Sequence, residues 1–187
     1  MALDLRTGLF VKKARDTDFT LDVGCGRSKR GIVGVDIERY PEVDVVCDAH
    51  HLPFHSDVFD GCYAYAVLEH VDEPLKVLRE INRVLRSRAW FKLLVPTDSR
   101  LRLDYAAMLV SFHWVNCWKL YRGMKLGGHK WQYNATSLKK MLNMAGFEVE
   151  KVERPAIPFI TGRKVGKILS KLKVVVHPYL IMESIKR

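Results

Sequence analysis

Two short apolar runs, each ending in a polar turn, constrain the fold of this 187-residue chain more than any other feature. Residues 21–26 read Leu-Asp-Val-Gly-Cys-Gly, and residues 32–37 read Ile-Val-Gly-Val-Asp-Ile. A buried strand that runs into a glycine turn, followed by a strand that ends on a carboxylate, is typical of a nucleoside site, because the ribose hydroxyls need an acceptor. The two runs therefore predict a cofactor pocket at the ends of adjacent strands.

The spacing of the glycines distinguishes two kinds of cofactor. A dinucleotide site carries the pattern G-x-G-x-x-G, and its acidic residue follows about 20 residues further on. Here residues 27–30 contain no glycine, and Asp36 follows Gly26 by only ten residues. The pattern Asp22-x-Gly24-x-Gly26 instead resembles the first motif of the class I S-adenosylmethionine-dependent methyltransferases, and Asp36 matches the acidic residue that ends their second strand.

Further blocks of the same family follow in order along the chain. Asp48 and Ala49 stand where the family has a carboxylate near the adenine amine. Residues 52–60 resemble its "LPF…FD" segment, residues 66–85 its "VLEHV…P…LREI.RVL" block, and residues 136–149 its "T..eL..ll..aGF.v" helix and strand. The combination is specific, although each block alone is not. Over about residues 19–96 and 129–153, the chain is therefore similar to the methyltransferases of the type 11 family.

The resemblance implies S-adenosyl-L-methionine as the cofactor and methyl transfer to a small-molecule or lipid-like acceptor. It implies that Asp36 accepts hydrogen bonds from the ribose hydroxyls and that Asp48 faces the adenine. The turn at residues 22–26 would hold the methionine part, and residues 64–66 would border the methyl group. The implied cofactor-binding residues are Asp22, Gly24, Cys25, Gly26, Asp36, Ile37, Asp48, Ala49, Ala64, Tyr65 and Ala66.

The link between the first two strands is unusually short. Five residues separate Gly26 from Ile32, whereas a parallel crossover that contains a helix needs about ten or more. The chain resembles a subgroup of the family whose first helix is contracted in this way. We expect the methionine end of the cofactor to lose helix N-terminal amides, and Arg27, Ser28 and Lys29 to supply donors in their place.

Apolar periodicity predicts an α/β fold independently of the family. Mostly continuous apolar runs, typical of strands covered on both faces of a parallel sheet, lie at residues 19–23, 32–36, 43–47, 58–64 and 90–95. Helical spacing predicts one helix capped by Asp72 with Pro74 in its first turn, and another from Thr136 to just before Gly146. We expect a single Rossmann-like methyltransferase domain over residues 1–187, with a mostly parallel sheet and helices on both faces. The resemblance adds an antiparallel last strand at residues 179–187.

Residues 97–128 resemble no block of the family and are expected to form a helical cap after the fifth strand. Within them, residues 105–121 are too apolar and aromatic for a solvated loop. A cap at this place would shape the acceptor pocket and exclude water. The same residues would equally serve as the core of a helical extension.

Two histidines are candidate catalytic residues. His129 precedes the second predicted helix, and His70 follows the fourth strand, near Tyr65. A neutral imidazole would accept the proton of a hydroxyl acceptor. The alternative is structural, with His70 bonded to the backbone and Trp131 packed under the cap. Methyl transfer from a sulfonium also needs no dedicated base where positioning supplies the rate.

No metal site is predicted. Cys47, His50, His51 and His55, with Cys62 nearby, match no tetrahedral ligand spacing. We expect these histidines to line the loop beside the adenine pocket, and the cysteines to act as small buried hydrophobes. The sequence shows no secretory signal and no long apolar span, which predicts reduced thiols and a cytoplasmic location.

The net charge of +10 is concentrated towards the C-terminus, where nine Lys or Arg residues follow position 150. Residues 162–176 can form an amphipathic helix with a basic face. This helix would close the sheet as a solvated element, bind an anionic membrane surface, or contact nucleic acid, and the first of these is favoured. A second hypothesis for the whole chain follows from the charge: a basic, methyltransferase-like binding module for RNA or a partner protein, with weak or no catalysis.

Overall fold

The structure, a computed structural model, describes residues 18–96, 130–131, 133–154 and 179–187. It also describes the backbone of four very short strands, which form two antiparallel pairs. β1 (Ala2–Asp4) pairs with β2 (Leu9–Val11), and β9 (Ile157–Pro158) pairs with β10 (Val175–Val176). Among all the residues that the structure describes, no helix combines the length and the apolar character needed to cross a membrane.

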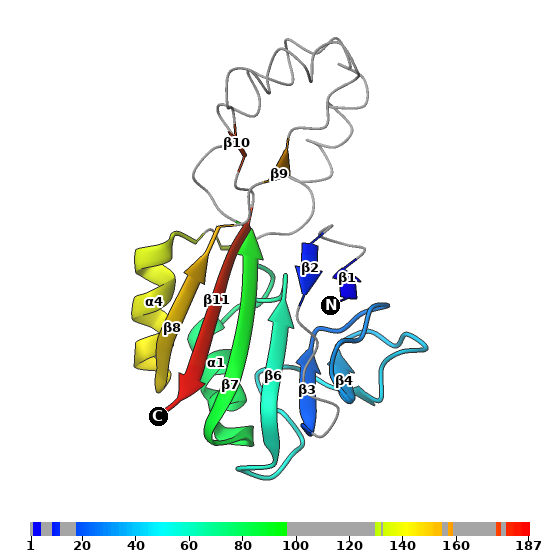
Figure 1. Cartoon of the computed structure of the whole chain (residues 1–187). Helices are drawn as coiled ribbons and strands as arrows, with labels where there is room; N and C mark the ends of the chain where they lie inside the picture. The colour runs from blue at the N-terminus through cyan, green and yellow to red at the C-terminus, as the bar shows by residue number, and fades with distance from the viewer. Residues whose placement is uncertain are drawn as a thin grey trace, which may run out of the picture.

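A seven-stranded sheet forms the centre of the molecule, with the strand order β5-β4-β3-β6-β7-β11-β8 (Figure 1). Its strands are β3 (Thr20–Val23), β4 (Val33–Asp36), β5 (Val45–Val46), β6 (Phe59–Tyr65), β7 (Leu85–Pro96), β8 (Phe147–Glu153) and β11 (Tyr179–Lys186). The first five strands in this order, β5-β4-β3-β6-β7, pair in parallel, whereas β11 is antiparallel to both of its neighbours, β7 and β8. The predicted mostly parallel sheet with an antiparallel last strand is therefore confirmed.

Two helices are described, and each begins close to its predicted position. α1 (Pro74–Val84) has Pro74 at its start, as expected, but Asp72 does not cap it. The N-cap residue is Glu73, without a side-chain bond, and the Asp72 carboxylate instead binds Lys130 Nζ at 2.6 Å. The predicted cap was therefore wrong, because a cation from a distant segment competes for this carboxylate.

The second helix, α4 (Ala135–Met144), starts one residue before Thr136. Its cap is Asn134, whose Oδ1 accepts the backbone N–H of Ser137 at 2.8 Å in a capping box. The helix predicted over residues 162–176 is incorrect at its end, where β10 occupies residues 175–176. Its remainder and the predicted cap at residues 97–128 lie outside the described residues.

The sheet has a different core on each face. α1 and α4 contact each other on one face, over buried side chains that include Phe59, Ile81, Phe91 and Phe147. Neighbouring strand residues point to the opposite face, where a second buried cluster forms. That cluster contains Tyr63, Tyr65 and Leu94, with Trp90, Tyr179 and Ile181 packed against it. Helices on this second face stay a prediction, since both described helices lie on the first.

The link between β3 and β4 contains no helix, so the contraction expected from the sequence is present. The loop returns directly along β3. At Gly31 an added Cβ would lie 2.9 Å from backbone atoms of Leu21 and Thr20, too close for any side chain. Two hydrogen bonds hold the loop against β3: Asp22 Oδ2 accepts the Arg30 N–H at 2.6 Å, and Thr20 Oγ1 accepts the Ile32 N–H at 3.1 Å.

We predict that Gly31→Ala destabilises the protein, because the methyl group has only backbone to displace. The free energy of unfolding should fall by roughly 1–3 kcal/mol, the usual cost of overpacking, when measured by urea denaturation. Ser28→Ala, in the same loop, is the control, because the Ser28 hydroxyl bonds no described residue, and it should leave the unfolding midpoint unchanged. Equal midpoints for the two variants would contradict the close approach at Gly31.

Candidate functional site

A cavity of about 700 Å³ opens where β3, β4 and β6 end. Its volume suits a small-molecule ligand. Most of the predicted cofactor-binding residues line it: Gly24, Gly26, Asp36, Ile37, Asp48, Ala49 and Ala66. His70, one of the two candidate catalytic residues, lines it as well. The structure therefore brings together residues that lie up to about fifty positions apart in the sequence.

Four predicted cofactor residues lie outside this lining. Asp22 is fully buried and binds the returning loop through the Arg30 N–H. Cys25 and Ala64 are also fully buried, and burial raises the pKa of the Cys25 thiol to about 12. Tyr65 points to the second face of the sheet, where the Arg30 guanidinium lies 4.6 Å from its ring centre. The other catalytic candidate, His129, lies outside the described residues.

The carboxylate of Asp36 joins the two loops that border the cavity. Its Oδ2 accepts the Gly26 N–H at 2.8 Å, and its Oδ1 accepts the Glu38 N–H at 3.0 Å. A carboxylate oxygen can accept two hydrogen bonds, so each oxygen retains accepting capacity. Asp36 is thus fixed by two backbone amides and is still able to accept hydroxyl groups of a ligand in the cavity.

Gly24 and Val67 meet at the base of the cavity. Gly24 has φ +67°, and an added Cβ would lie 2.3 Å from Val67 Cγ2, so both the backbone and the available space require glycine. The neighbouring Ala66 also has positive φ, +56°, and its N–H donates to the Leu94 carbonyl at 2.9 Å. A non-glycine residue held in this conformation is uncommon and is concentrated at functional sites.

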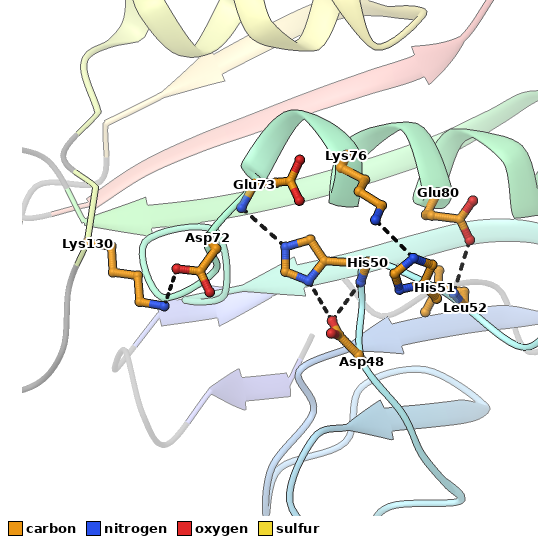
Figure 2. A network of polar contacts seen from close by, with 9 residues as sticks. All are labelled: Asp48, His50, His51, Leu52, Asp72, Glu73, Lys76, Glu80 and Lys130. Atoms are coloured by element: carbon orange, nitrogen blue, oxygen red, sulfur yellow. Dashed lines mark hydrogen bonds and ion pairs between the residues drawn. The ribbon is translucent and has the colours of Figure 1, made fainter.

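Asp48 and His50 also line the cavity, and Figure 2 shows the hydrogen bonds between them. Asp48 Oδ1 accepts the His50 backbone N–H at 2.9 Å and faces His50 Nδ1 at 2.6 Å. These hydrogen bonds hold the pKa of Asp48 below its ordinary value, and the bond from the His50 backbone N–H has the largest effect. Partial burial of the carboxylate opposes this shift. His50 was expected to line the loop beside the adenine pocket, but no sequence pattern indicated its bonds to Asp48 and to Glu73, the N-cap of α1.

A segment from much later in the chain closes another side of the cavity. Lys130, Trp131 and Tyr133 are bonded to the loop at residues 68–72, which follows β6. The bonds are Lys130 N and Trp131 N to the Glu69 carbonyl (2.6 and 3.3 Å), Trp131 Nε1 to the Val71 carbonyl (2.8 Å), Tyr133 Oη to the Leu68 carbonyl (2.9 Å) and Lys130 Nζ to Asp72 (2.6 Å). Lys130 and Asp72 both line the cavity. Trp131 is 44% exposed, so its indole acts here through this hydrogen bond rather than through burial.

The loop at residues 68–72 also contains a buried carboxyl group. Glu69 is 1% exposed, and its Oε2 has no hydrogen-bond partner among the described residues. Burial raises the pKa of this carboxyl group to about 7. The pKa of the Tyr133 phenol is also raised, mainly by its own burial and to a smaller extent by the nearby Glu69 carboxyl group.

The histidines and cysteines examined as metal ligands serve separate contacts. His50 binds Asp48, the ring of His51 lies 2.9 Å from Lys76 Nζ, and Cys62 is fully buried. Across the described part of the chain, no three or more His, Cys, Asp or Glu side chains gather as metal ligands would.

Comparison with known proteins finds a match to a methyltransferase family over part of the chain. Residues 21–93 match the type 11 family whose description is "Methyltransferase domain". An uncharacterised protein of Methanocaldococcus jannaschii is 33% identical over 98 residues, which are 44% of this chain and 39% of that protein. An uncharacterised 37.1 kDa protein in a transposon of Streptomyces fradiae is 30% identical over 123 residues, 52% of this chain and 36% of that protein. The matches thus span less than two fifths of the length of either relative.

Solved structures of methyltransferases share the fold. One from Thermotoga maritima, described as a possible histamine N-methyltransferase, has a TM-score of 0.62 at 18% identity and covers 92% of this chain and 84% of its own. One from Methanosarcina mazei, described as S-adenosylmethionine-dependent, has a TM-score of 0.60 at 18% identity, with 93% and 94% covered. The 1,6-didemethyltoxoflavin-N1-methyltransferase of Burkholderia thailandensis, solved with S-adenosylhomocysteine, has a TM-score of 0.57 at 18% identity, with 90% and 71% covered.

We predict that Glu69 makes the protein less stable as the pH rises. Its pKa is about 7 in the folded state and 4.5 ordinarily, so the unfolded chain releases this proton first. The free energy of unfolding should therefore fall between pH 4.5 and pH 7, by up to about 3 kcal/mol from this group. Urea denaturation at several pH values measures this slope, and Glu69→Gln should flatten it.

The matched control is Glu148→Gln, which changes an exposed carboxyl group on β8. It should retain the pH slope of the natural protein. A slope that is equally steep with Glu69→Gln would contradict the assignment to Glu69.

Proposed function

Because this chain carries a type 11 methyltransferase domain within the class I, S-adenosylmethionine-dependent fold, we propose that it binds S-adenosylmethionine in the cavity and transfers the methyl group to an acceptor. The observation that carries this proposal is Asp36, a carboxylate at the end of β4 that lines the cavity with accepting capacity to spare. An acceptor of this kind is what a ribose diol requires.

The other residues of the cavity fit the remaining parts of this cofactor. Asp48 Oδ2 bonds no described residue, so it is available to accept the adenine amine. The absence of a side chain at Gly24 and Gly26 lets the cofactor approach the backbone where the methionine part would lie. Of the three residues expected to supply donors there, only Arg27 lines the cavity, since Lys29 binds Asp44 at 2.8 Å and Ser28 lies outside the lining.

When bound, S-adenosylmethionine supplies a methyl group attached to a positively charged sulfur. A lone pair of the acceptor attacks the methyl carbon as the carbon–sulfur bond breaks. The protein's part is to hold the acceptor in line with that bond and to exclude water. Lys130 and Asp72 form an ion pair in the lining of the cavity, and His70 lines the cavity as well. For a hydroxyl acceptor we propose that His70 takes the released proton, with His129 as a further candidate.

We propose a small-molecule or lipid-like acceptor, because one cavity of about 700 Å³ has to admit both the cofactor and the reacting end of the acceptor. The cytoplasm is the location that we propose with it. The net charge of +10 favours one alternative, a module that binds RNA or a partner protein with weak or no catalysis.

We predict that Asp36→Ala lowers the affinity for S-adenosylhomocysteine at least tenfold, because the ribose loses a charged acceptor. Isothermal titration calorimetry measures this, with circular dichroism to confirm that the variant folds. Asp36→Asn retains one acceptor oxygen and should lose less. The matched control is Glu148→Ala, an exposed carboxylate on β8, which should bind as the natural protein does.

The same titration tests the proposal as a whole. Heat of binding that vanishes in Asp36→Ala supports a cofactor site in the cavity. Absence of binding by the natural protein at millimolar S-adenosylmethionine and S-adenosylhomocysteine would overturn it. RNA binding whose affinity falls steeply with salt, in a protein that binds neither ligand, would establish the alternative.

A further inference from the structure

We propose that His50 is a positioning residue of the cofactor site, which fixes the Asp48 carboxylate through one ring nitrogen and anchors it to the start of α1 through the other. The inference rests on the proposed function, since Asp48 is taken to receive the adenine amine. In Figure 2 the His50 ring lies between Asp48 and Glu73, and dashed lines join it to both.

The hydrogen bonds define where the ring proton lies. His50 Nε2 is 3.2 Å from the backbone nitrogen of Glu73, which can only donate, so Nε2 is the accepting nitrogen. The proton of the neutral ring is then on Nδ1, directed at Asp48 Oδ1 at 2.6 Å. His50 thus uses its one donor and its one acceptor at the same time, an arrangement that a doubly protonated ring could not maintain.

The exposure of the two side chains shows which one orders the other. The Asp48 side chain is 52% exposed, whereas that of His50 is 14% exposed. A half-exposed carboxylate is free to rotate unless a neighbour holds it, and ordering it on ligand binding costs affinity. His50 holds Oδ1 with two donors, its own N–H and Nδ1–H, which directs the remaining accepting capacity of Oδ2 to a ligand.

Other contacts hold this loop on α1 without His50. Glu80 accepts the Leu52 N–H at 3.0 Å, Lys76 Nζ lies 2.9 Å from His51, and Arg83 donates to the carbonyls of Leu52 and Phe54 at 2.9 and 2.7 Å. Substitution of His50 should therefore leave the loop attached and the protein folded. The expected loss concerns the direction of the Asp48 carboxylate.

Two variants separate the two bonds of the ring. His50→Asn places an amide donor near the position of Nδ1 and cannot reach Glu73, whereas His50→Gln places an amide oxygen near the position of Nε2 and loses the donor to Asp48. Isothermal titration with S-adenosylhomocysteine should show an affinity about tenfold lower for His50→Gln and a smaller loss for His50→Asn. His55→Gln, at an exposed histidine further along the same loop that lies outside the cavity lining, is the control and should bind normally.

A second ligand distinguishes positioning from a general structural effect. S-inosylhomocysteine carries a carbonyl oxygen in place of the adenine amine, so it has no such donor for Asp48. The natural protein should prefer S-adenosylhomocysteine, and this preference should shrink both in His50→Gln and in Asp48→Ala. Adding His50→Gln to Asp48→Ala should cause no further loss, because both changes remove one contact.

An unchanged preference between the two ligands in a folded His50→Gln would overturn the role of His50. Nuclear magnetic resonance of the natural protein tests it without any substitution, since carbon and nitrogen shifts of the imidazole should report the Nδ1–H form. The Nε2–H form would overturn it equally. These outcomes are separate from failure of the proposed function, in which the natural protein binds neither ligand.

Discussion

Hydrogen bonds between carboxylates and backbone amides hold the loop at residues 24–32, and the cavity that this loop lines depends on them. A helix would satisfy the amides of an ordinary crossover, and without one they need other acceptors. Asp22 accepts the Arg30 N–H, and Asp36 accepts the Gly26 N–H. Asp44 extends the arrangement at the next strand, where it accepts the Gly34 N–H at 2.6 Å and binds Lys29. The strands are short enough for this return, since β3 spans only residues 20–23.

This arrangement gives two carboxylates a double role. Asp36 joins the two loops and also lines the cavity, and Asp48 is bonded to His50 while its other oxygen lies free of described partners. Hydrogen bonds to a carboxylate favour its charged form, as the lowered pKa of Asp48 shows. Each carboxylate is thus held in place before a ligand arrives, so a ligand does not have to order it. This double role links binding to folding, because a ligand bound to Asp36 would also stabilise the loop that Asp36 holds.

The sequence predicts the parts of this structure that local patterns determine, and misses those that distant partners determine. Continuous apolar runs locate β3, β4 and β6 within a residue or two, and Pro74 marks the start of α1. Asp72 has the right position and chemistry for a cap, yet Lys130 binds it from far along the chain. The expectation for Asp22 came from its motif, whereas the structure directs it to Arg30 in the contracted loop. No pattern near His50 points to Glu73, because that contact exists only after the loop has packed on α1.

The loop between β6 and α1 connects the two sides of the cavity. On the side where we propose that the adenine lies, the Glu73 N–H anchors His50, and on the side proposed for the acceptor the adjacent Asp72 binds Lys130. Lys130, Trp131 and Tyr133 are further bonded to carbonyls of this loop, so the same loop has contacts on both sides of the cavity. A cofactor that fixes Asp48 and His50 would hold Glu73, and with it the segment that an acceptor must meet. Because such a coupling free energy is reciprocal, an acceptor held beside Lys130 would tighten the hold on the cofactor to the same degree.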